Sequence, residues 1–279
     1  MLFSDHALSC RLEAAEGYAC RQFTIARRRL LPNSGSEAIR VAGADVVFDG
    51  PDSPITQTFG LGIFEPLTPQ DLEKIEQFFT TRGAATHHEV SPFAGAATLQ
   101  LLCARAYHPI EVSNVLYRPI ELPFEPVPEV QASMHIHVRV IGRDEAALWS
   151  EVNARGWSQE HPEFETFLRD IGTVIVNREN SPCFIAEIDG QPGAAGALAI
   201  HEGVALFAGA STVPEFRRRG LQTALLEARM RFACEQGCDL VMMVAEPGSN
   251  SQRNAQRQGF VIAYTRLKWQ KHAEHADKL

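Results

Sequence analysis

The chain has 279 residues, of which 45% are hydrophobic and 22% are charged, and its formal net charge is −8. This composition is typical of a folded globular protein, and the length allows one or two domains. The acidic balance argues against a nonspecific nucleic-acid binder, which normally carries a basic surplus. No run approaches the ~18 apolar residues that span a bilayer. The six cysteines are scattered, so we expect a cytoplasmic protein without a disulfide framework.

The sequence of the N-terminal part predicts a capped helix followed by a strand–helix–strand unit. We expect a helix to begin at Pro69, with Thr68 as its N-cap and Asp71 in its first turn. The pattern then predicts a strand, a helix and a second strand, at Thr86–Ser91, Ala96–Arg105 and Tyr107–Arg118. The same order recurs at the end of the chain, which fits either an internal duplication or a coincidence of pattern.

A proline-rich segment divides the chain. Four prolines lie between Pro119 and Pro128, and proline disfavours both helix and central strand, so we expect a stiff connector. We therefore predict an N-terminal domain at residues 1–125, a linker at 126–133 and a second domain at 134–279.

The sequence of the second domain predicts six strands and four helices that do not simply alternate. Asp189-Gly190 and Glu202-Gly203 are turn signals between strands, Asp144 is a candidate N-cap, and Gly237 ends a long helix. We expect strands at Met134–Ile141, Phe184–Ile188, Gly193–His201, Val204–Thr212, Leu240–Ala245 and Phe260–Trp269, with helices at Asp144–Arg155, Pro162–Ile171, Gly220–Glu235 and Asn250–Gln258. The order β-α-α-β-β-β-α-β-α-β predicts an α/β fold with a mixed (α+β-type) sheet rather than a doubly wound one.

One turn of this domain has the chemistry of an anion site. An apolar strand ends before Pro214, the basic run Arg217–Arg219 follows, and Gly220 begins a long amphipathic helix. Backbone N–H groups at a helix N-terminus lack partners within the helix, and the helix dipole adds positive potential there. Guanidinium groups add charged donors for phosphate oxygens. The turn therefore predicts either a phosphate site or a solvated basic cap.

This stretch resembles motif A of the GNAT N-acetyltransferases, Gln/Arg-x-x-Gly-x-Gly/Ala after a strand that ends in proline. Arg217 and Gly220 match the pattern, whereas Gln222 departs from the expected small residue. The element order over residues ~134–270 also matches the GNAT fold. The N-terminal part resembles a degenerate GNAT half. Residues 60–69 precede its long helix, but they contain no Arg-x-x-Gly turn. The resemblance thus implies two tandem GNAT-like domains, the first without a cofactor site.

The resemblance implies acetyl-CoA as the acyl donor, bound in a V-shaped opening between the strands that end at Thr212 and Ala245. Its pantetheine would pair with backbone near the first of these ends, and its pyrophosphate would rest on the N–H groups of the following helix. The implied cofactor-binding residues are Thr212, Val213, Arg217, Arg218, Arg219, Gly220, Leu221, Gln222, Thr223, Asn250 and Asn254. The acceptor would be a small-molecule or peptide amine, with an oligomer allowed and no nucleic acid, membrane or metal ion involved.

The catalytic acid and base stay open. Many GNAT enzymes have a tyrosine four residues before a Gly-Phe pair, and Ala255 occupies that place here. Either Ser251, Tyr264 or water serves as the acid, or the step needs no dedicated acid, and the candidates for the base are Glu202, His201 and Glu151. The chain is therefore expected to acetylate an amine by direct attack, or else to bind acyl-CoA as a sensor without turnover. The pairs His135/His137 and His272/His275 are explained without a metal, by a sheet edge and a frayed terminus.

Overall fold

The computed structural model describes residues 3–121, 136–158 and 165–271. The predicted linker at residues 126–133 lies outside these ranges, as do His135, His272 and His275. The described residues form two compact units, and neither unit is one continuous stretch of chain. Unit 1 takes the described residues within 25–30 and 117–243, and unit 2 takes those within 2–24, 31–116 and 244–279.

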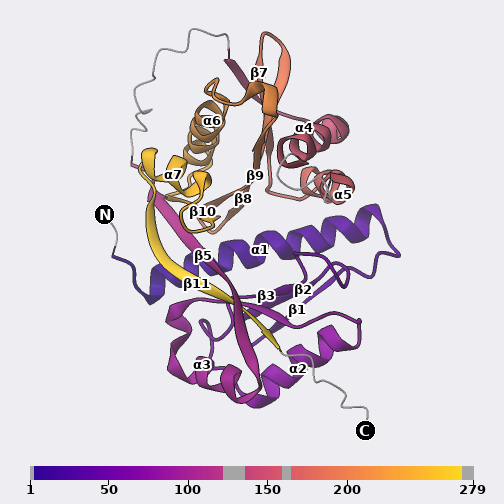
Figure 1. Ribbon diagram of the computed structural model, residues 1–279, viewed down its shortest axis with the longest axis vertical. Coiled ribbons are helices and arrows are strands. Elements are labelled where there is room, and N and C mark those ends of the chain that lie inside the picture. The colour runs from indigo at the N-terminus through magenta and orange to yellow at the C-terminus, as the bar shows by residue number, and fades with distance from the viewer. Residues whose placement is uncertain (1–2, 122–135, 159–164, 272–279) are drawn as a thin grey trace. The chain divides into compact units, whose positions relative to one another are not determined.

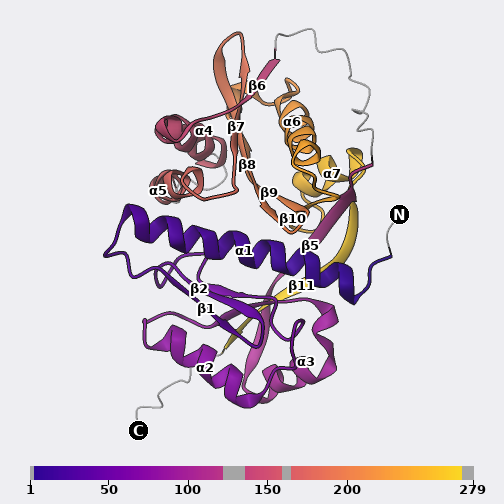
Figure 2. The same ribbon diagram turned by 180° about the vertical axis from the view of Figure 1, so that it is seen from behind.

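Unit 1 contains the central elements of the predicted acyltransferase order. Its strands are β6 (Ile136–Val140), β7 (Cys183–Ile188), β8 (Gln191–His201), β9 (Val204–Thr212) and most of β10 (Leu240–Ala245). Its helices are α4 (Ala146–Ser158), α5 (Glu165–Val176) and α6 (Leu221–Glu235). Helices α4 and α5 lie on one side of the strands β7–β9, and α6 lies on the other side (Figures 1 and 2).

Unit 2 joins the N-terminal elements to the last helix and strand of the described chain. Its helices are most of α1 (His6–Leu30), α2 (Pro69–Thr80), α3 (Gly95–Ala104) and α7 (Asn250–Arg257). Its strands are β1 (Glu37–Val41), β2 (Ala44–Phe48), β3 (Gln57–Phe59), β4 (His87–Val90), most of β5 (Tyr107–Pro119) and β11 (Val261–Lys271).

The strands form one mixed sheet of eleven strands among the described residues, in the order β1-β2-β3-β4-β11-β5-β10-β9-β8-β7-β6. From β6 onward the elements follow the chain as β-α-α-β-β-β-α-β-α-β, which confirms the predicted order and the mixed α/β class. Strand β11 pairs antiparallel with β4, so that Leu267 lies opposite Val90. The last described strand is therefore part of the same compact unit as the N-terminal strands.

Two expectations about helix starts have different outcomes. Thr68 caps α2 as predicted: its hydroxyl accepts the N–H of Asp71, and the Asp71 carboxylate accepts the N–H of Thr68, a reciprocal capping box. The predicted N-cap Asp144 is wrong, because that residue lies inside a 3₁₀ turn, Arg143–Glu145, that precedes α4. There the Glu145 carboxylate accepts the N–H of Gly142 and satisfies the terminus instead.

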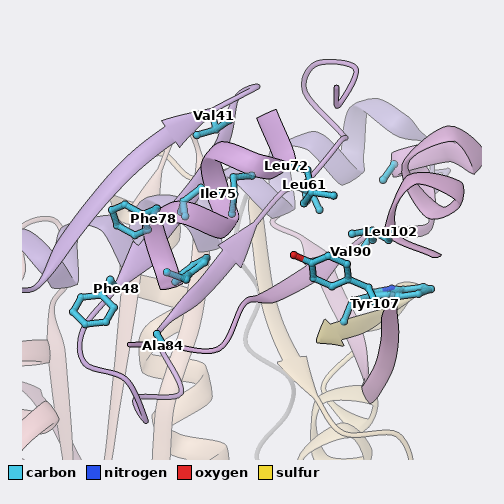
Figure 3. Packing of buried hydrophobic residues seen from close by; sticks show 14 residues of the cluster. Val41, Phe48, Leu61, Leu72, Ile75, Phe78, Ala84, Val90, Leu102 and Tyr107 are labelled. Carbon is cyan, nitrogen blue, oxygen red and sulfur yellow. The ribbon is translucent and has the colours of Figure 1, made fainter. Parts of the chain in front are cut away.

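The core of unit 2 lies between helices α2 and α3 and the sheet. Leu72, Ile75 and Phe79 of α2 are fully buried, and they belong to one apolar cluster with Leu102 of α3 and Trp269 of β11 (Figure 3). The spacing of the α2 residues, three and then four positions apart, gives the helix one apolar stripe.

His88 is a buried polar side chain beside this core. Its side chain is fully buried on β4, and its ring centroid lies 4.9 Å from that of Tyr107. Neither ring nitrogen has a hydrogen-bond partner among the described residues. Burial lowers the pKa of His88 to about 3, so the ring is neutral in the folded protein.

A buried ionic network joins α1 to the sheet of unit 2. The guanidinium of Arg266 on β11 donates to Glu13 at 3.2 Å and to both carboxylate oxygens of Glu16, and it lies 3.1 Å from Glu89. The Tyr264 hydroxyl donates to the same Glu13 oxygen at 2.8 Å. Burial raises the pKa of Glu13 and that of Glu89. Three carboxylates therefore share one guanidinium, and the two deepest are the easiest to protonate.

None of the helices in the described part of the chain is long and apolar enough to cross a bilayer.

Candidate functional site

Strand β9 extends beyond its pairing with β10. The two strands are parallel, and the register joins Val204–Leu206 to Leu240–Met242. The following six residues of β9, 207–212, continue past the last paired position. This edge of β9 therefore carries backbone groups that point away from β8 and are not used by the β10 ladder.

At the end of β9, the backbone groups of neighbouring residues point toward opposite edges of the strand. The N–H of Val213 donates to the carbonyl of Gly193 at 2.9 Å, and the carbonyl of Val213 accepts the N–H of Phe216. Because neighbouring residues of a strand alternate, Thr212 directs its N–H toward the other edge, away from β8. Of the two strand-end residues predicted to contact the cofactor, Thr212 thus presents a backbone donor on the open edge, whereas both backbone groups of Val213 are engaged within the protein.

A β-bulge interrupts β9 shortly before this end. The β8–β9 register pairs Ala195 with Ser211 and Ala197 with Ala208, so two residues of β9 oppose one residue of β8. The first of these two β9 residues is Gly209, whose φ of 59° lies in the left-handed region. A bulge of this kind bends the strand and re-aims the groups that follow.

Helix α4 holds the bulge through Asn153, a residue that the sequence reasoning did not single out. Its side-chain amide donates to the Gly209 carbonyl at 2.6 Å, and its backbone carbonyl accepts the Ser211 hydroxyl at 3.0 Å. No pattern in the sequence marks this asparagine, because its partners lie more than 50 residues away.

The turn after β9 forms a concave set of backbone donors. A 3₁₀ turn, Pro214–Phe216, leads into the turn, where Arg218 has a φ of 62° and Gly220 a φ of 87°. Gly220 is the N-cap of α6 and makes no side-chain cap bond. Among the described residues, none accepts a hydrogen bond from the backbone N–H groups of residues 218–223. Successive N–H groups at a helix N-terminus, with left-handed residues between them, form an anion-binding concavity.

Gly220 is required by its conformation rather than by crowding. A Cβ at this position would meet only the Ile136 side chain, at 3.4 Å, but a φ of 87° strains any L-residue. The glycine therefore sets the direction of the first N–H groups of α6.

The polar side chains of the turn divide into two groups. Arg217 donates to the carbonyls of Thr212 and Gly156, at 3.3 and 2.9 Å, and Gln222 donates to the Thr212 hydroxyl at 2.7 Å. These two side chains fix the turn to the end of β9. Arg218 and Arg219 are exposed, with Arg219 above the Phe216 ring, and they give the N–H concavity a positive surface.

The residues predicted on α7 lie in unit 2, whereas the strand end and the turn lie in unit 1. Asn250, Ser251 and Asn254 are exposed on this short helix, and its N-cap is Ser249. Ala255, at the place of the usual GNAT tyrosine, is the buried residue of α7.

The structure gives the proposed acids and bases separate surroundings. Tyr264 is buried in the Arg266 network of unit 2. Glu202 is exposed in the β8–β9 turn with a φ of 45°, and His201 ends β8. Glu151 on α4 pairs with Arg169 on α5.

Comparison with known proteins assigns this domain. A model of the "Acetyltransferase (GNAT) family" matches residues 145–260. These residues form a GNAT acetyltransferase domain. The match includes the bulged strand, the N–H concavity and α7, and it confirms the family suggested by Arg217 and Gly220. No curated protein matches the chain at the level of sequence.

Solved structures extend the likeness to most of the chain. A GCN5-related N-acetyltransferase from Kribbella flavida has a TM-score of 0.63 at 18% identity, covering 91% of this chain and 96% of its own. A GCN5-related N-acetyltransferase from Sphaerobacter thermophilus has a TM-score of 0.54 at 14% identity, with coverages of 93% and 91%. A tandem GNAT protein from the clavulanic acid biosynthesis pathway has a TM-score of 0.59 at 16% identity, with coverages of 92% and 89%. The chain thus has the fold of a tandem GNAT protein.

Proposed function

We propose that this protein is an acetyl-CoA-dependent N-acetyltransferase that moves an acetyl group to an amine by direct attack. The observation that carries the proposal is the N–H concavity of residues 218–223, which lies directly after the open edge of β9 inside a GNAT acetyltransferase domain. Acetyl-CoA offers the two features that this surface suits, a pyrophosphate and the extended pantetheine chain with its amides.

The fit to acetyl-CoA rests on complementary chemistry at two places. The N–H groups of residues 218–223, with the positive end of α6, suit the pyrophosphate, and Arg218 and Arg219 are free to add charged donors at its rim. Thr212 suits a pantetheine amide, in the manner of a strand added to a sheet edge. Asn250 and Asn254 stay candidates for the pantetheine and sulfur end.

Catalysis in this proposal depends mainly on positioning. The lone pair of the neutral amine attacks the thioester carbonyl carbon, the CoA thiolate leaves with the electrons of the broken C–S bond, and the nitrogen loses one proton to water or to one of the candidate bases. Backbone N–H donors of the β9 edge would stabilise the oxyanion that develops on the carbonyl oxygen. A thiolate with a pKa near ~8.5 is a tolerable leaving group, so no dedicated acid is needed at the place of Ala255.

The second candidate is an acyl-CoA-binding sensor without turnover. Ala255 favours it, because a buried methyl group cannot donate a proton to a leaving thiolate. Release of free thiol from acetyl-CoA, measured across a panel of polyamines, amino acids, aminoglycosides and peptides, separates the two. A sensor binds acetyl-CoA but releases no thiol above the background.

The cofactor site is tested with two glycines at opposite ends of α6. Gly220 and Gly237 both have positive φ, 87° and 76°, so a valine strains both positions alike. Gly220→Val should weaken acetyl-CoA binding, measured by calorimetry, at least about tenfold, since ~1.4 kcal/mol is a factor of ten and several N–H bonds are involved. Gly237→Val should leave the affinity unchanged. Equal affinity of the two folded variants would reject the site.

A further inference from the structure

The part of β8 that faces the bulge of β9 accepts side-chain hydrogen bonds from both faces of the sheet. From the α4 side, the indole N–H of Trp149 donates to the carbonyl of Gly196 at 3.3 Å and to that of Phe184 at 3.1 Å. From the α6 side, Arg229 donates to the carbonyl of Ala197 at 3.2 Å. Gly196 is the single β8 residue that faces Gly209 and Ala210 of β9, the two residues of the bulge. The two donors therefore meet β8 at Gly196 and Ala197, where the bulge interrupts the ladder with β9.

Arg229 has an unusual environment for a cation. Only 2% of the residue is exposed, and its other bond goes to the carbonyl of Leu225 in its own helix. The guanidinium carbon lies 4.7 Å from the centroid of the Phe207 ring. No carboxylate pairs with it among the described residues, and burial lowers the pKa of Arg229 to about 10. The cation is thus balanced only by carbonyl oxygens and an aromatic face.

Stability does not explain such a residue. An unpaired buried charge is expensive, and apolar side chains of similar volume usually replace buried cations at little loss or with a gain in stability. What Arg229 contributes that an apolar side chain would not is a directed hydrogen bond to the carbonyl of Ala197, the β8 residue next to the one that faces the bulge. The absence of a side chain at Gly196 leaves room for it, because a Cβ there would lie 3.3 Å from the guanidinium carbon.

We propose that Arg229 is a positioning residue for acyl transfer, acting with Trp149 to fix the bulge and so to aim the N–H groups of the open β9 edge at the acyl carbonyl. This inference rests on the proposed function. Arg229 touches no substrate; it acts through Ala197 and the bulge. The N–H concavity of residues 218–223 is not part of the contacts from Arg229 to the bulge. The affinity for the CoA moiety therefore does not depend on Arg229.

The two ligands acetyl-CoA and CoA separate positioning from general structural support. A neutral hydrogen bond to the acyl carbonyl should make acetyl-CoA bind about threefold to tenfold more tightly than CoA. Arg229→Met keeps the length and apolar volume of the side chain but removes the donor. The full-length variant should retain its affinity for CoA within about threefold and lose the preference for acetyl-CoA. Arg229→Lys, which keeps a cation, should restore part of the preference and also serves if the methionine variant does not fold.

Arg231 provides the matched control on the same helix. Its side chain is 58% exposed and only 3.9 Å from Glu227, so Arg231→Met makes the same chemical change outside the core. This variant should keep the wild-type preference. A folded Arg229→Met that keeps the preference, or that loses affinity for both ligands equally, would overturn the inference and leave the proposed function intact. Wild-type protein that binds both ligands equally would also overturn the inference, and wild-type protein that binds neither would reject the proposed function itself.

Discussion

Replacement of His88 by phenylalanine should remove a defined acid sensitivity from unit 2. The ordinary histidine pKa of 6.5 falls to about 3 in the folded protein because the ring is buried. Between these two values the unfolded chain binds a proton that the folded chain does not. The stabilisation from the neutral ring is therefore complete above pH 6.5 and is lost as the pH falls toward 3. The phenyl ring keeps the packing against Tyr107 and has nothing to protonate.

The expected size follows from proton linkage. Relative to its value at pH 8, the unfolding free energy of the wild type should drop by about 1.4 kcal/mol at pH 5.5 and about 2 kcal/mol at pH 5 on account of His88 alone. Urea denaturation of wild type and His88→Phe, followed by circular dichroism at pH 8, 6.5, 5.5 and 5, measures this. The difference between the two proteins cancels the titration of the other groups. A difference that stays constant over this pH range would refute the buried, neutral state of His88.

Further predictions concern the ionic network and the number of cofactors bound. Burial raises the pKa of Glu13 in the folded protein. The contribution of Glu13 to stability therefore falls as the pH rises above the ordinary pKa of a glutamate. The urea midpoint of Glu13→Gln should accordingly increase relative to that of the wild type as the pH rises. The matched variant Glu16→Gln removes a two-oxygen bond to Arg266 and should lower the unfolding free energy by about 1.5–3 kcal/mol at pH 7. Calorimetry on the full chain should give one acetyl-CoA per chain, because Thr68 and Asp71 already occupy the N-terminus of α2; two bound equivalents would contradict the degenerate first domain.

Local signals predicted the acyltransferase elements well. The bounds of Val204–Thr212 and Leu240–Ala245 are those expected, because each is an apolar run between a turn signal and a proline or polar loop. The predicted start of α6, with Gly220 immediately before its first residue, followed from a glycine after a basic turn.

Helix α1 was not predicted, because its buried stripe has little hydrophobic contrast. Alanines occupy much of that stripe, and Glu13 and Arg27 are also buried there. Gly17 sits inside the helix, which lowers its propensity, yet a Cβ at this position would lie 2.7 Å from the Asp45 carboxylate. The glycine is explained by a close contact that no sequence pattern shows. Strands β1–β3 were missed because they have only three to five residues.

The residues that hold the candidate site in place could not be predicted from short stretches of sequence. In the sequence, Arg229 looks like a solvated arginine on a long helix, and Asn153 like an ordinary polar helix residue. Both act on backbone carbonyls of distant strands, at a bulge that only the register reveals. Domain boundaries at residues 125 and 134 stay a prediction, since the compact units combine segments from both halves of the chain.

The position of β11 between β4 and β5 has a consequence for synthesis. During translation, the end of β4 is made about 170 residues, and the end of β5 about 140 residues, before their shared partner at residues 261–271. Until then each presents an unpaired strand edge, with Tyr107 and Val90 without the Trp269 side chain that covers them in the finished core. The nascent N-terminal half therefore exposes strand edges and apolar surface until the last strand is made. A stalled chain that ends before residue 261 should accordingly be protease-sensitive even though its first 120 residues are complete.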